Sequence, residues 1–141
     1  MEEREPISDP TWRTVLRAYE RRTADVLRDP TEAALARLAA QERRLEQAFA
    51  RPGRVELGLL VQTPGAGEAI QTAAHHPLEF LLRHKMGDWG ELPPEDLAEN
   101  ERSVQLGARI FSAYRTRRDA KLWVITEWDR LATTLLLPEE Y

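Results

Sequence analysis

The sequence contains no cysteine, which excludes disulfides, thiolate nucleophiles and cysteine-ligated zinc. Its apolar runs are all much shorter than the roughly 18 residues that a membrane helix needs. The first ten residues, Met1 to Pro10, are acidic and polar and lack the apolar core of a secretory signal peptide. We therefore expect a soluble, cytoplasmic protein that does not bind a membrane.

The composition of the chain indicates a folded domain. Of its 141 residues, 42% are hydrophobic and 31% are charged, which argues against disorder. This length is sufficient for one domain with a buried core. A formal net charge of -4 is mild, so the chain as a whole shows no signature of polyanion binding.

The first third of the sequence predicts two helices. Residues 1–8 are read as a short flexible lead, and the Asp9-Pro10 pair has the cap-then-proline pattern of a helix start. The Asp29-Pro30 pair has the same pattern, so it is predicted to end one helix and begin the next. We expect an antiparallel helical hairpin over 9–50 that either covers a face of the sheet or binds a partner. A homodimer through this hairpin is one expected assembly.

Residues 54–141 predict an α+β domain with the element order β-α-α-α-β-β-β. Prolines mark three helix starts, and glycines follow two of the helix ends. Apolar alternation then predicts strands, so that the mainly antiparallel sheet ends in a three-stranded meander. The strands are expected at 55–63, 109–116, 121–127 and 133–137.

Four polar residues form the candidate catalytic set: His84, Glu127, Arg109 and Arg130. A carboxylate base, an imidazole acid and two arginine phosphate clamps would suffice for metal-independent RNA cleavage. The alternative is a solvated sheet edge with surface ion pairs and cross-strand threonine pairs. We favour this second interpretation, because surface charges are the commoner case.

The loop Asp88-Trp89-Gly90-Glu91 surrounds one large aromatic side chain with glycines. Trp89 is either a core anchor whose N–H bonds to the loop backbone, or an exposed platform on which a base stacks. Together with basic and polar residues of the meander, the loop supplies the ligand-binding candidates: Asp88, Trp89, Ser112, Tyr114, Thr133, Arg117, Arg118 and Lys121.

No cofactor or metal is predicted. Gly65-Ala66-Gly67 follows a strand but lacks the spacing of a phosphate-binding loop. His75 and His76 are adjacent, so their side chains diverge, and no third ligand occurs at a recognised spacing.

The last 85 or so residues, from Leu57 onward, carry a longer pattern that we quote by its densest parts: Gly87-Asp88-Trp89-Gly90-Glu91-Leu92, Ile125-Thr126-Glu127, Asp129-Arg130, Thr133-Thr134, Leu137-Pro138 and Glu140-Tyr141. This pattern resembles a family of small, uncharacterised bacterial proteins that are often labelled plasmid-related and sometimes a type I restriction subunit. The resemblance implies a mobile-element setting and no catalytic residues. Trp128 and Leu131 depart from the pattern. The order of strand, helices and meander is also similar to that of RelE-like and barnase-like ribonuclease toxins.

The sequence therefore leaves two functions open. The first is a non-catalytic module that binds nucleic acid or a partner protein. The second is a metal-independent ribonuclease of toxin type.

Overall fold

A computed structural model describes residues 9–141. The chain divides into two compact units, Met1–Gly53 and Arg54–Tyr141, and each is considered by itself. The predicted lead 1–8 lies outside the described residues. Within residues 9–141, no helix is both long enough and apolar enough to cross a membrane.

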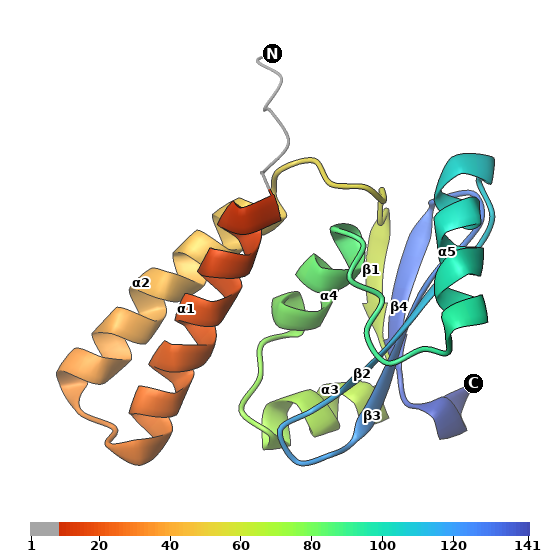
Figure 1. Ribbon diagram of the computed structural model, residues 1–141. Coiled ribbons are helices and arrows are strands. Elements are labelled where there is room, and N and C mark those ends of the chain that lie inside the picture. The colour runs from red at the N-terminus through yellow and green to blue at the C-terminus, as the bar shows by residue number, and fades with distance from the viewer. Residues whose placement is uncertain (1–8) are drawn as a thin grey trace. The chain divides into compact units, whose positions relative to one another are not determined.

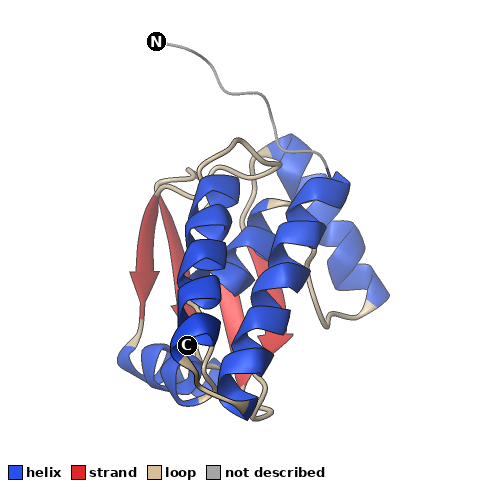
Figure 2. Cartoon of the chain, turned by 90° about the vertical axis from the view of Figure 1, so that its left-hand side faces the viewer, coloured by secondary structure: helices blue, strands red, loops and turns tan. Residues whose placement is uncertain are grey.

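The first unit is a helical hairpin of α1 (Asp9–Arg28) and α2 (Glu32–Phe49). The second helix begins two residues later than Pro30, because Thr31 is its N-cap and accepts a hydrogen bond from the Ala34 amide at 3.0 Å. The buried Gln41 donates across the hairpin to the carbonyl of Val15 at 3.4 Å. Both helices of this unit, and those of the second unit, can be followed in Figure 2.

The second unit contains four strands and three α-helices. Each α-helix begins at a proline, where the missing backbone N–H costs no hydrogen bond. In chain order the elements are β1 (Leu59–Gln62), α3 (Pro64–Thr72), α4 (Pro77–Lys85), α5 (Pro94–Leu106), β2 (Ile110–Arg115), β3 (Lys121–Thr126), β4 (Ala132–Leu136) and a short 3-10 helix η1 (Pro138–Glu140).

The strands form one sheet in the order β1-β4-β3-β2. The strands β2, β3 and β4 form an antiparallel meander, and β1 joins it in parallel beside β4. The helices α4 and α5 lie on opposite sides of this sheet (Figure 1). The α+β class and the mainly antiparallel sheet are therefore confirmed.

The first strand is shorter than the predicted 55–63. Val55 and Leu57 are buried but precede the strand, since the amides of Arg54 and Val55 bond to the carbonyl of Lys85. Gly58 then turns the chain with a φ of 64°, and a Cβ there would lie 2.4 Å from the Leu131 carbonyl oxygen. The close approach of this backbone to the start of β4 therefore delays pairing until Leu59.

Alternation along the meander separates the two faces of the sheet as predicted. Ile110, Ser112 and Tyr114 are fully buried on the face that α4 covers. Phe111 and Trp123 are only half-buried on the other face, where their rings pack edge to face at 5.0 Å. The sheet thus has one closed face and one partly open face.

Candidate functional site

A chain of buried polar side chains crosses the closed face of the sheet. The imidazole of His84, on α4, lies 2.6 Å from Ser112 Oγ of β2 and 2.8 Å from Thr126 Oγ1 of β3. Thr126 lies 2.7 Å from the hydroxyl of Thr133 on β4, which in turn donates to the carbonyl of Leu57 at 2.7 Å. His84, Ser112, Thr126 and Thr133 are all 0% exposed. We call these four residues and the Leu57 carbonyl the polar chain.

The direction of every hydrogen bond in the polar chain follows from its last member. A carbonyl only accepts, so Thr133 donates its single hydroxyl proton to the carbonyl of Leu57. Thr126 must then donate to Thr133 and accept from His84, which places the imidazole proton on Nε2. The unprotonated Nδ1 accepts from Ser112. The polar chain is therefore completely satisfied by a neutral His84 in the Nε2–H tautomer.

Burial and, to a lesser extent, the positive charge of Arg130 lower the pKa of His84 to about 3. The imidazole has no exposed surface and both ring nitrogens are engaged in the polar chain. A general acid must reach the atom that it protonates. This placement argues against the predicted role of His84 in RNA cleavage. Ser112 and Thr133, which were ligand candidates, are likewise buried in the core.

The other catalytic candidates lie around the β3–β4 turn and at the start of β2. The side chain of Glu127 is exposed, and its backbone amide donates to the carbonyl of Ala132 at 3.1 Å. The residue opposite Thr133 is Thr126. Arg109 is exposed, and its guanidinium donates to the hydroxyl of Tyr141 at 2.9 Å.

Arg130 binds the backbone of its own fold. Its guanidinium donates to the carbonyls of Ser103 at 3.0 Å and Ala108 at 2.7 Å, at the C-terminal end of α5. It also donates to the carbonyls of Glu127 and Trp128 within its turn. A cation at a helix C-terminus satisfies carbonyls that lack intrahelical partners. This arginine is therefore placed to join the turn to α5.

The loop after α4 is held as a backbone partner of β2. Asp88 forms an ion pair with Arg83 at 2.8 Å, and its carbonyl accepts from the hydroxyl of Tyr114 at 2.5 Å. Trp89 is 4% exposed and packs edge to face on His84 at 5.9 Å. Its indole N–H is buried without a hydrogen-bond partner among the described residues. Trp89 is thus the predicted core anchor, but its N–H does not bond to the loop.

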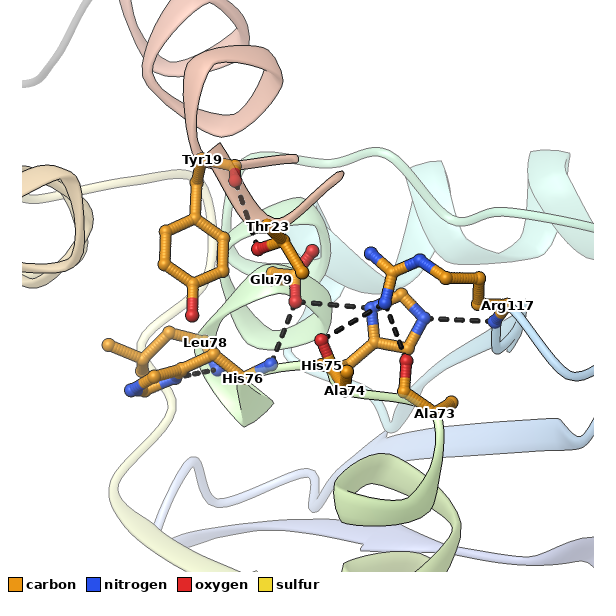
Figure 3. Close-up of polar contacts among 9 residues, drawn as sticks. All are labelled: Tyr19, Thr23, Ala73, Ala74, His75, His76, Leu78, Glu79 and Arg117. Atoms are coloured by element: carbon orange, nitrogen blue, oxygen red, sulfur yellow. Dashed lines mark hydrogen bonds and ion pairs between the residues drawn. The ribbon is translucent and has the colours of Figure 1, made fainter. Parts of the chain in front are cut away.

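Figure 3 shows the polar contacts of His75, His76 and Arg117. His76 caps α4 by accepting from the Leu78 amide at 3.0 Å, and the buried Glu79 accepts from the His76 amide at 2.7 Å. His75 lies 3.1 Å from Glu79 and 2.9 Å from the Arg117 amide. The Arg117 guanidinium donates to the carbonyls of Ala73 and Ala74, where α3 ends. These groups join helix ends to the β2–β3 turn.

Few of the basic residues of the meander remain available for a ligand. Arg115 is paired with Glu91 at 2.9 Å and with Asp119 at 3.1 Å. Arg118 and Lys121 are exposed, and neither takes part in an ion pair found among residues 9–141. The predicted basic surface is therefore reduced to these two side chains and Arg109.

The two edges of the sheet differ sharply. Along β2, the Asn100 side chain both donates to the Phe111 carbonyl at 2.6 Å and accepts from the Phe111 amide at 3.1 Å. The amide of Glu91 donates to the Ala113 carbonyl at 2.7 Å, and the Ala113 amide donates to the carbonyl of Trp89 at 3.1 Å. The outward backbone groups of Phe111 and Ala113 are thus covered.

The β1 edge is open and apolar. Leu59, Leu60 and Val61 are 69%, 43% and 41% exposed. Beside them lies a groove of about 330 Å³ between β1 and the start of α4, whose walls are mainly apolar. We call this feature the β1 groove; it is lined by Leu60, Val61, Gln62, His76, Pro77, Leu78, Leu81 and Leu135. His76 is the one ionisable side chain among these lining residues.

The sequence reading missed this site. The signal was present in Leu59-Leu60-Val61, an apolar run, but periodicity cannot tell a buried central strand from an exposed edge strand. Comparison with protein-family models, with curated proteins and with solved structures found no match to this chain. The resemblance to plasmid-related proteins therefore stays a prediction.

Proposed function

We propose that the chain is a non-catalytic protein-binding module that accepts an extended segment of a partner at the β1 edge. The observation that carries this proposal is the contrast between the two edges of one sheet. An exposed edge strand is a template for pairing with another chain, and proteins commonly block it with charge, proline or a covering segment. Here β2 is covered, whereas β1 has no charge, no proline and three exposed apolar residues.

The β1 groove defines the chemistry of the expected partner. A segment that extends the sheet makes backbone hydrogen bonds along the edge, and its alternate side chains enter pockets on one face. The groove is large enough for aliphatic side chains and is mainly apolar. We therefore expect an extended segment that presents an apolar side chain at every second position.

The placement of the polar residues supports binding over catalysis. His84 is enclosed within the polar chain, and Arg130 is occupied by four carbonyls of its own fold. A ribonuclease would need both groups to reach one substrate. We accordingly rank the ribonuclease reading below binding.

A second candidate function, the binding of single-stranded nucleic acid, is favoured by the partly open face of the sheet. Trp123 lies edge to face with Phe111 at 5.0 Å and with Tyr141 at 5.8 Å, beside the exposed Lys121. Aromatic side chains with a nearby cation form the usual platform for stacked bases. The net charge of -4 opposes this second function.

The test is a selection from a random-peptide library on the immobilised chain. We expect enrichment of peptides with apolar residues at alternate positions. The variant Leu60→Lys introduces a charge into the β1 groove that a bound peptide would bury, and it should lower their affinity at least tenfold. The matched control is Leu106→Lys, which changes a leucine that is 78% exposed on α5 and should leave the affinity unchanged.

Equal loss of peptide binding in both variants, or no loss in either, would rule out the β1 groove as the binding surface. Single-stranded RNA is tested in parallel by quenching of tryptophan fluorescence. Binding of RNA that is lost in Trp123→Ala and retained in Leu60→Lys would favour the second candidate function.

A further inference from the structure

The hydrogen-bonding groups of the open edge can be assigned from the pairing of β1 with β4. The amide of Leu59 donates to the Leu131 carbonyl at 2.9 Å, and the amide of Thr63 donates to the Leu135 carbonyl at 3.0 Å. Residues along a strand direct their backbone groups alternately to the two sides. Leu60 and Gln62 therefore point their N–H and C=O groups away from the sheet, and no described residue bonds to them.

We propose that the segment that fills this edge is β1 of a second copy of the chain, in an antiparallel dimer centred on Val61. This inference rests on the proposed function and names its partner. A twofold axis perpendicular to the sheet makes the two copies of β1 antiparallel and continues each face of the sheet across the interface. The result is one continuous sheet of eight strands.

The spacing of Leu60 and Gln62 fixes the register of this dimer. In an antiparallel ladder, two residues that exchange both hydrogen bonds lie directly opposite each other. Leu60 then lies opposite Gln62 of the second copy, and Gln62 opposite Leu60, so all the outward groups of both residues are paired. Val61 lies opposite its own counterpart at the centre. A register centred on Leu60 would leave Gln62 without a residue of β1 opposite it.

The side chains of the edge suit an identical partner. The residues Leu59 to Gln62 carry no charge, so two copies meet without like-charge repulsion. The register places the second copy's Leu60 beside Gln62, which lines the β1 groove. Leu60 of each copy thus places an apolar side chain at the apolar β1 groove of the other copy.

The covered β2 edge explains why such an assembly stops at two copies. Sheets with two open edges can continue to add strands and form fibres. After β1 pairs with β1, the remaining edge of each copy is β2, where Asn100 and the loop Trp89 to Glu91 already occupy the outward groups. The assembly is therefore closed. The surface that a four-residue strand buries is small compared with the roughly 800 Å² per partner of a standard interface. We therefore expect association that depends on protein concentration.

The absence of native cysteine allows a direct test by cross-linking of the full chain. Residues opposite each other at a non-hydrogen-bonded site have Cα atoms about 4.5 Å apart, which a disulfide can bridge. Val61→Cys should therefore give disulfide-linked dimers under mild oxidation. Leu106→Cys, on the exposed surface of α5, is the matched control and should remain monomeric. Adding Leu60→Lys to the Val61→Cys chain should abolish the cross-link.

The outcomes separate this inference from the proposed function. Equal cross-linking at Val61 and Leu106, or cross-linking at Val61 that survives Leu60→Lys, would overturn the dimer. So would the absence of any Val61 cross-link together with a monomeric sedimentation profile at high concentration. If selected peptides still bind the β1 groove in that case, the proposed function stands with a different partner. If peptides also fail to bind, both proposals fall.

Discussion

The polar chain makes a quantitative prediction about the pH dependence of stability. His84 is neutral in the folded protein because burial lowers its pKa to about 3, whereas an imidazole in an unfolded chain titrates near 6.5. The unfolded state therefore binds more protons at acidic pH, and the free energy of unfolding falls as the pH falls. His84 has no such effect above pH 6.5. Its contribution is lost progressively as the pH falls from 6.5 towards 3.

The magnitude follows from the two pKa values. At pH 5 the unfolded imidazole is about 97% protonated and the folded imidazole is almost entirely neutral, which lowers the free energy of unfolding by ~2 kcal/mol relative to pH 8. This loss of stability hardly changes for any pKa of His84 in the folded state below about 4. For a domain of this size, ~2 kcal/mol is a substantial fraction of the total stability.

The assay compares the wild-type chain with His84→Gln by urea denaturation, followed by circular dichroism and tryptophan fluorescence, at pH 8 and pH 5. Glutamine offers an amide N–H donor and a carbonyl acceptor but does not titrate. We expect His84→Gln to be less stable at pH 8 and to lose ~2 kcal/mol less than the wild type on acidification. Parallel losses in both proteins would refute the reasoning. A ¹⁵N NMR spectrum at pH 6 should also show the Nε2–H tautomer for His84.

Two further predictions concern the covered edge of the sheet. Gly90 has a φ of 76°, and a Cβ there would lie 2.0 Å from a carbonyl oxygen of β2; we expect Gly90→Ala to lower the free energy of unfolding by more than ~3 kcal/mol. Its control is Gly107→Ala, where φ is also positive at 71° but the space is open, so that ~1 kcal/mol is expected. Asn100→Ala leaves both edge groups of Phe111 unpaired and should cost ~2 kcal/mol by urea denaturation. Asn100→Asp keeps the acceptor and should accelerate amide exchange at Phe111 less than Asn100→Ala does; equal exchange in the two variants would contradict the edge-covering role.

Local signals in the sequence predicted most of the elements. Prolines at 64, 77 and 94 mark the helix starts because proline fits the first helical turn, and alternation in β2 and β3 identifies the faces of the sheet. The parallel position of β1 beside β4 was not predictable, because periodicity describes a strand and not its neighbour. The start of α2 was misplaced for a related reason, since Asp29 and Thr31 are both good caps and the choice between them depends on local geometry.

The candidate site was predicted less well, because polarity was taken as a sign of exposure. Ser112 alternates with the buried Ile110 and Tyr114, and a polar residue on an apolar face requires a buried partner. The position of Ser112 in the pattern therefore contained the evidence for the polar chain. Its partners could not be identified in the same way, because His84 is 28 residues from Ser112 in the sequence.

The polar chain also determines where the open edge lies. Thr133 joins β4 to β3 through Thr126, and it joins β4 to the segment before β1 through the carbonyl of Leu57. A slip of β4 by one residue that brought Ala132 to the place of Thr133 would leave the hydroxyl proton of Thr126 and the carbonyl of Leu57 unpaired in the core. Each such group costs about 1–3 kcal/mol, so that register is strongly disfavoured. Because β1 begins two residues after Leu57, the same hydrogen bonds that enclose His84 hold β1 at the edge of the sheet, where Leu60 and Gln62 face outward.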